Sequence, residues 1–65
     1  MKNGTNREDI FVGLEVDIIL KKDQRTGDLT RGNVQDILTS SAQHSRGIKV
    51  RLTTGEVGRV ANIMD

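Results

Sequence analysis

The sequence predicts an all-β domain of four to five short antiparallel strands, built from two similar hairpins. A chain of 65 residues is long enough for one small domain. Apolar and polar residues alternate over residues 14–21 and again over residues 48–53, which is the pattern of half-buried strands. The motif Gly-x-Val-x-x-Ile follows each of these segments, at residues 32–37 and 58–63. The two halves of the chain are therefore expected to fold alike.

We expect residues 1–9 to form a flexible N-terminal segment and residues 10–65 to form the single domain. Asn6 is expected to cap a short helical turn with Glu8 and Asp9 in it, and this turn leads Ile10 into the core. Helix is otherwise not expected. The N-terminus has no apolar stretch of the kind found in secretion signals. The longest apolar run, residues 18–20, is far shorter than the ~20 residues that span a bilayer. We therefore expect a cytoplasmic protein that does not enter a membrane.

The first hairpin begins at Gly13 and contains a long polar loop, residues 21–28, with a turn signal at Thr26-Gly27. The strand after this loop carries Val34 and Ile37, and the two-residue gap between them predicts a bulge after the valine. Residues 39–46 lack periodicity and are expected to form an exposed connector.

The second hairpin begins at Gly47 and turns at residues 53–56, where Gly55 can supply a positive φ. Its last strand repeats the gap of the first hairpin and predicts a bulge after Val60. Strands of this number and length favour a small curled barrel of the SH3-like type. The expected inward side chains are all aliphatic: Leu14, Val16, Ile18, Leu20, Leu29, Val34, Ile37, Ile48, Val50, Leu52, Val57, Val60 and Ile63.

The scarcity of aromatic residues and the lack of cysteine exclude several classes of function. The chain has one Phe and no Trp, Tyr or Cys. Grooves for proline-rich peptides, cages for methylated lysine and platforms for stacked bases all need several aromatic side chains. Disulfide bonds and thiolate zinc sites need cysteine. A nucleic acid would therefore be bound mainly through its phosphates.

The net charge of +1 conceals an uneven distribution. Residues 1–20 carry two basic and four acidic side chains, whereas residues 21–59 carry eight basic and four acidic ones. A basic central segment is compatible with an anionic partner. The candidate nucleic-acid-binding residues are the basic ones of this segment: Lys21, Lys22, Arg25, Arg31, Arg46, Lys49, Arg51 and Arg59.

These basic residues also have a purely structural interpretation. The carboxylates of the long loop can neutralise the basic residues there, in which case the loop only aids solubility. Lys49 and Arg51 point to the same side of their strand, and they pair across the sheet if Glu15 and Asp17 lie on a neighbouring strand. If those acids lie elsewhere, the face is a basic stripe. The strand order decides between the two, and the sequence does not determine it.

No pattern in the chain indicates an enzyme, a cofactor or a metal site. His44 lies among serines in the connector, where no rigid frame would hold it as a catalytic base, so an exposed loop histidine is expected. The seven glycines fit turns and strand ends rather than a phosphate-binding loop. We expect a protein that is not an enzyme and that binds no cofactor, metal or small-molecule substrate.

The chain resembles the YwbE-like family of small, mostly bacterial, uncharacterised proteins over residues 7–63. The run Asp23-Gln24-Arg25-Thr26-Gly27 and the segments 13–20, 29–32, 37–39, 47–52 and 55–60 carry this resemblance. It implies a compact β domain and no particular activity. A looser likeness is to the KOW motif of ribosomal and transcription-elongation proteins, from which the chain departs in its longer first loop.

Two functions from different classes follow as hypotheses. The first is a small binding module that contacts structured RNA or a ribonucleoprotein through the basic loop and strand. The alternative is a protein–protein adaptor or a homodimer that uses exposed strand edges together with Phe11, Ile19 and Leu38.

Overall fold

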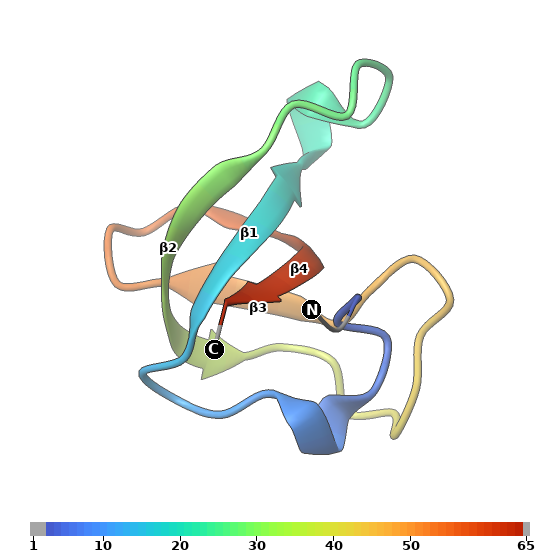
Figure 1. Cartoon of the computed structure of the whole chain (residues 1–65), viewed down its shortest axis with the longest axis vertical. Helices are drawn as coiled ribbons and strands as arrows, with labels where there is room; N and C mark the ends of the chain where they lie inside the picture. Colours follow the sequence, from blue (N-terminus) through green and yellow to red (C-terminus); the bar gives the residue numbers. More distant parts are fainter. Residues whose placement is uncertain (1–2, 65) are drawn as a thin grey trace.

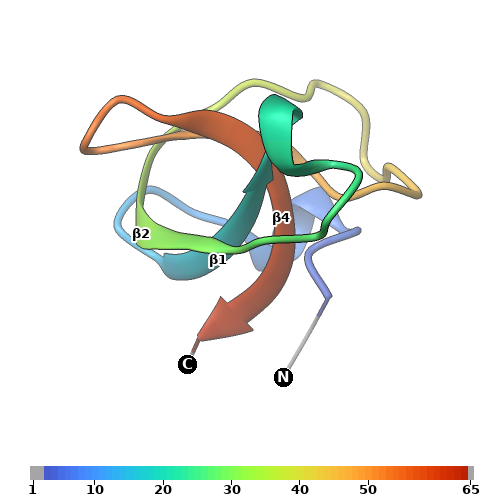
Figure 2. The same ribbon diagram turned by 90° about the horizontal axis from the view of Figure 1, so that it is seen from above.

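The computed structural model describes residues 3–64 and shows a closed antiparallel barrel with the strand order β1-β2-β3-β4 (Figure 1). The strands are β1 (Glu15–Leu20), β2 (Thr30–Ile37), β3 (Lys49–Leu52) and β4 (Val57–Met64). Seen from above, β1, β2 and β4 curve around a common centre (Figure 2). The all-β fold class and the small SH3-like barrel predicted from the sequence are confirmed, with four strands.

The two hairpins, β1–β2 and β3–β4, have the same register. Val16 lies opposite Gly32 in the first hairpin, and Val50 lies opposite Gly58 in the second. Gly13 and Gly47, which precede the first strand of each hairpin, have φ angles of +97° and +99°. The likeness between residues 13–18 and 47–52 therefore extends to the backbone conformation, and the prediction of two hairpins built alike is confirmed.

The two hairpins also join each other in the same way on both sides of the barrel. β1 pairs with β4, and a register shift in β4 leaves Ala61 without a partner residue. β2 pairs with β3, and a register shift in β2 leaves Gln35 without one. Both bulges follow the valine of the Gly-x-Val-x-x-Ile motif, as predicted, and they let short strands bend enough to close the barrel.

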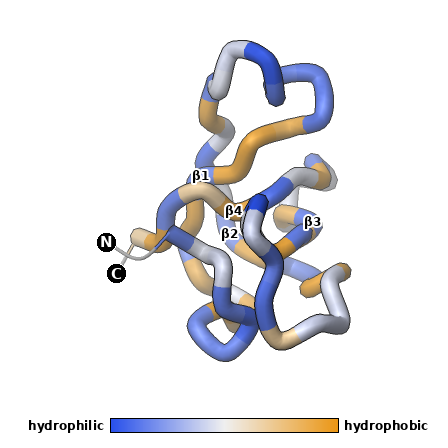
Figure 3. The backbone as a smooth tube through the Cα atoms, turned by 90° about the vertical axis from the view of Figure 1, so that its right-hand side faces the viewer, coloured by the Kyte–Doolittle hydropathy of each residue, from blue (hydrophilic) through white to orange (hydrophobic). Residues whose placement is uncertain are grey.

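The barrel interior is aliphatic, and apolar and polar stretches follow one another along the chain in Figure 3. The buried hydrophobic residues are Ile10, Leu14, Val16, Ile18, Val34, Ile48, Val50, Leu52, Val60 and Ile63. Leu20 and Ile37 are partly buried against this core. The expectation for Leu29 was wrong: it is 50% exposed, because it ends the long loop just before β2 begins. Val57 is only half-buried.

Two single turns of 3-10 helix flank β1. The first, η1 (Arg7–Asp9), forms where a helical turn was predicted, but the Asn6 side chain makes no capping hydrogen bond. The second, η2 (Lys21–Asp23), was not predicted, and it starts the long loop that projects beyond the barrel in Figure 1. Among residues 3–64, no helix is long and apolar enough to cross a membrane.

The segment before η1 lies against the connector between the hairpins. The amide of His44 donates to the carbonyl of Thr5 at 2.9 Å, and the amide of Ile48 donates to that of Gly4, also at 2.9 Å. Gly4 is buried, so the packed part of the chain extends to this residue. The flexibility predicted for residues 1–9 stays a prediction, and residues 1–2 lie outside the described residues. The predicted exposed connector is confirmed over residues 40–43.

Candidate functional site

The outer face of β3 and β4 brings two cations into direct opposition. Lys49 of β3 and Arg59 of β4 are partners across the antiparallel pair. Arg59 in turn lies opposite Ile19 of β1, so one row across the sheet reads Ile19, Arg59, Lys49. Alternation along the strands turns all three side chains away from the core.

Two adjoining hollows lie over this row, and we call them together the basic groove. One, of about 330 Å³, is lined by Ile19, Gln24, Arg46 and Arg59. The other, of about 440 Å³, is lined by Ile19, Lys21, Gln24, Lys49, Val57, Gly58 and Arg59. None of these lining residues, all within residues 3–64, is acidic. Four of the eight candidate residues thus border one groove.

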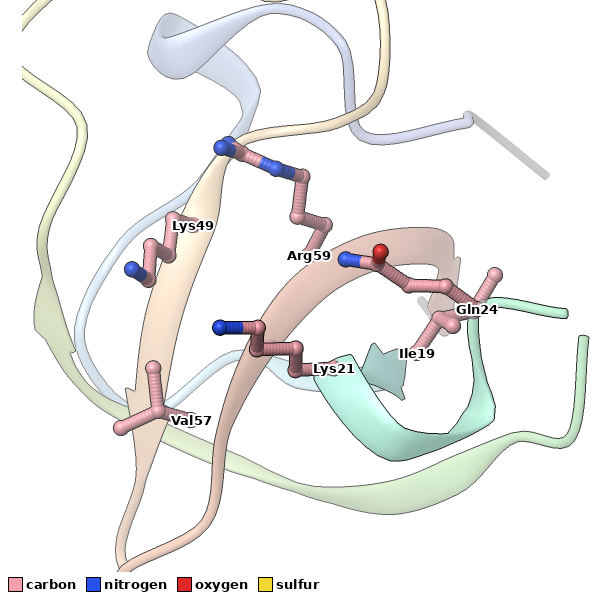
Figure 4. Close-up of a pocket in the computed structure, with 7 residues that line it drawn as sticks. Ile19, Lys21, Gln24, Lys49, Val57 and Arg59 are labelled. Carbon is pink, nitrogen blue, oxygen red and sulfur yellow. The ribbon is translucent and has the colours of Figure 1, made fainter.

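The η2 turn supplies the far wall of the basic groove. Because the chain turns sharply after Leu20, Lys21 and Gln24 lean over the sheet instead of continuing the line of β1. Figure 4 shows Lys21 extending from η2 toward the side of Lys49, with the Gln24 amide facing Arg59. Ile19 and Val57 add apolar walls.

Arg59 is held in place by the backbone. Its Nη1 donates a hydrogen bond to the carbonyl oxygen of Gly47 at 3.2 Å, and the residue is half-buried. An anchored guanidinium loses less conformational freedom when it binds an anion than a freely rotating one. Arg59 is therefore the best-organised cation of the groove.

Arg46 enters the groove from a connector turn that His44 organises. The Nδ1 atom of His44 accepts a hydrogen bond from the backbone amide of Arg46 at 3.2 Å, and its carbonyl accepts one from Gly47 at 2.9 Å. His44 is half-buried rather than exposed as expected, because its backbone also bonds to the N-terminal segment. It acts here as a local acceptor that shapes the turn.

The other candidate residues lie apart from the groove, and acids neutralise three of them. Arg31 contacts the buried carboxylate of Asp17 through two nitrogens, at 2.9 and 3.3 Å. The hydrogen bond from Arg31 holds the pKa of Asp17 below its ordinary value, although burial acts in the opposite direction. The same hydrogen bond raises the pKa of Arg31. Asn62, which lies opposite Asp17 on β4, lowers the pKa of Asp17 further.

Arg51 and Lys22 form exposed ion pairs. Arg51 reaches Asp36 at 3.1 Å, and Lys22 reaches its neighbour Asp23 at 3.4 Å. Arg25 is exposed in the long loop and lines neither hollow. The long loop, taken as a whole, is thus not where the basic residues gather.

The strand order answers the question that the sequence left open. β3 pairs with β2 and β4, so Glu15 and Asp17 of β1 do not lie beside it. Arg51 is neutralised by Asp36 of β2, whereas Lys49 faces Arg59 and forms a basic stripe with it. No pattern in the sequence marks Ile19, Gln24 and Val57 as groove residues, since only the closure of β1 against β4 brings them there.

The arrangement suits the binding of a phosphate. Lysine supplies a mobile point charge and arginine supplies paired donors that match phosphate oxygens. Cations grouped in a concave site raise the local concentration of anions.

Comparisons with known proteins assign the chain to a family. The family model described as "Uncharacterized conserved protein (DUF2196)" matches residues 3–63. The "Uncharacterized protein YwbE" of Bacillus subtilis (strain 168) is 58% identical over 62 residues, which is 95% of each chain. No solved structure matches. The resemblance found in the sequence is confirmed, and the chain belongs to the YwbE-like family of uncharacterised conserved proteins (DUF2196).

Proposed function

We propose that this protein is a small non-enzymatic binding module of the cytoplasm that holds structured RNA, alone or in a ribonucleoprotein, by its phosphates. The observation that carries the proposal is the cross-strand pair of Lys49 and Arg59 in the basic groove, with Lys21 and Arg46 on its rim.

The first hairpin shows that the fold does not need this pair. Like charges directly opposite in an antiparallel sheet are destabilising. At the equivalent register position, the first hairpin has Glu15 opposite Asn33, which involves no repulsion. An anionic ligand would remove the repulsion between Lys49 and Arg59. Binding of such a ligand would therefore explain why two cations occupy opposite positions in the sheet.

The lack of aromatic groove residues supports phosphates as the contacted groups. Phe11 is 59% exposed, but it precedes β1 and lines neither hollow. Without stacking platforms, unpaired bases gain little from this surface. Folded RNA presents closely spaced phosphates and hides its bases, which matches a groove with four cations.

Barrel closure bears on the alternative hypothesis of an adaptor or a homodimer that uses strand edges. Each of the four strands pairs with a neighbour on both sides, so the edges that strand addition requires are largely occupied. Ile19, one of the apolar residues of that hypothesis, lines the basic groove. We therefore favour RNA.

A titration of the isotope-labelled protein with a short RNA hairpin tests the proposal. We expect amide shifts at Ile19, Lys49 and Arg59 that disappear at high salt. Lys49→Gln should weaken binding several-fold. Arg51→Gln is the matched control, because it removes the same charge from the same strand at a position already paired with Asp36.

Two results would count against RNA binding at this groove. One is the absence of salt-dependent shifts at the three residues. The other is an equal loss of affinity in Lys49→Gln and Arg51→Gln, which would show that only net charge matters.

A further inference from the structure

Four cations that form no ion pair among the described residues border the basic groove, whereas Arg25 lies apart from it in the long loop. Asp17, Asp36 and Asp23 neutralise Arg31, Arg51 and Lys22 elsewhere on the surface. Lys21, Arg46, Lys49 and Arg59 border the basic groove, where no acidic side chain lines the wall among the described residues. A surface that follows a nucleic-acid backbone would instead spread its free cations along a track.

The groove has the size of a small-molecule site. Its hollows of about 330 and 440 Å³ fall at the lower end of the range for pockets that enclose small ligands. A group that enters from the end of a chain can fill such a hollow, whereas internal phosphates of a helix lie along a convex surface. The η2 turn strengthens this distinction, since Lys21 and Gln24 wall the groove on the side of the long loop (Figure 4).

The charge of the groove matches a phosphate monoester better than a diester. An internal phosphodiester carries one negative charge, and a terminal monoester carries close to two at neutral pH. The monoester also presents three oxygens that accept hydrogen bonds. Arg59, anchored on the Gly47 carbonyl, can supply paired donors, while Lys21 and Lys49, which line the same hollow, supply further charge.

From these observations we infer that the basic groove binds the terminal phosphate monoester of an RNA strand in preference to internal phosphodiesters. This inference rests on the proposed RNA-binding function and specifies which phosphate occupies the site. Gln24, which lines both hollows, lies where its amide can contact the first nucleotide beyond that phosphate.

Three forms of one RNA hairpin with single-stranded ends test the inference. They carry a 5′-phosphate, a 3′-phosphate or hydroxyls at both ends, and each has the same fluorophore in its loop. Binding to the full-length protein is measured by anisotropy. We expect the RNA with a 5′-phosphate, the RNA with a 3′-phosphate, or both of these RNAs to bind roughly tenfold more tightly than the RNA with hydroxyls at both ends.

The variant Arg59→Asn should abolish this difference, and Arg51→Gln should preserve it. Equal affinity for all three RNAs, with Arg59→Asn weakening each of them equally, would overturn the inference and leave the proposed function in place. No salt-dependent binding of any of the three RNAs would overturn both.

Discussion

Arg59 donates a hydrogen bond to the carbonyl oxygen of Gly47 at 3.2 Å, and the first hairpin has the same bond in neutral form. There, the Nδ2 atom of Asn33 donates to the carbonyl oxygen of Gly13 at 3.0 Å. The two donors hold equivalent positions in the hairpin register. The second hairpin thus uses a charged side chain for a task that the first accomplishes without charge.

This equivalence predicts how substitutions of Arg59 separate folding from binding. Arg59→Asn should leave the free energy of unfolding within about 0.5 kcal/mol of the parent protein, since the asparagine can keep the bond to Gly47. Arg59→Ala should lower it by about 0.5–1.5 kcal/mol, because the carbonyl loses its partner. Urea denaturation measures both values. Equal destabilisation by the two variants would contradict the equivalence.

Gly47 is expected to be the least replaceable glycine of the hairpins. A Cβ atom at this position would lie 2.2 Å from the carbonyl oxygen of Val60, and φ is +99°. Gly55→Ala is the matched control: φ is +100° there, but no atom lies within 4 Å of a Cβ. We expect Gly55→Ala to cost about 1–2 kcal/mol through backbone strain alone. Gly47→Ala should cost at least about 3 kcal/mol, which would unfold much of so small a domain. Circular dichroism with thermal melting distinguishes the two, and similar melting temperatures would refute the clash.

The ion pair of Asp17 and Arg31 should make stability depend on pH. The folded state lowers the pKa of Asp17, so below about pH 5 the unfolded chain binds more protons than the folded one. Stability should therefore be fully present near neutral pH and decline as the pH falls through the folded-state pKa. Glu56 contributes in the same direction, because the Thr54 hydroxyl lowers its pKa.

The measurement is urea denaturation between pH 7 and pH 3. Asp17→Asn should be less stable than the parent at pH 7 and should lose less stability on acidification. Adding Glu56→Gln should flatten the profile further. An unchanged pH profile in Asp17→Asn would show that the ion pair does not stabilise the folded state.

Salt dependence should report the number of groove cations that contact RNA. With up to four phosphate contacts, we expect the logarithm of the binding constant to fall with the logarithm of salt concentration at a slope of roughly −2 to −4. Lys49→Gln should reduce the size of this slope by about one. Arg51→Gln should change it less, because Asp36 already neutralises that charge. Identical slopes for the parent and Lys49→Gln would place the contacts elsewhere.

Particular residues show how far the sequence predicted the fold. Alternation identified the buried faces of β1 and β3, because a side-chain period of two leaves few choices once one face is apolar. It did not predict that Asp17, on the other face of β1, is also buried. The gap between Val34 and Ile37, and its repeat at Val60 and Ile63, located both bulges. Leu29 was misplaced because an apolar residue at a loop end looks the same in sequence as one at a strand start.

The candidate site was predicted only as a set of charges. All four groove cations were among the eight candidates, but so were Arg31 and Arg51, whose carboxylate partners lie on other strands. Lys49 and Arg51 are two residues apart and point to the same side of β3. One faces Arg59 and the other Asp36, a difference that arises entirely from the neighbouring strands.

The amino-acid sequence is sufficient to predict an aliphatic barrel of two matched hairpins, without the aromatic side chains or thiolates that several binding sites require. Those properties depend on composition and on short-range periodicity, which the chain carries locally. Which charges neutralise one another, and which remain together in the basic groove, follows from the arrangement of the strands in space. Barrel closure places β4 between β1 and β3, and so brings Ile19, Arg59 and Lys49 into one row. The electrostatic interaction of two side chains depends on the distance between them. The strand order sets these distances, and it depends on pairing between segments that are far apart in the sequence.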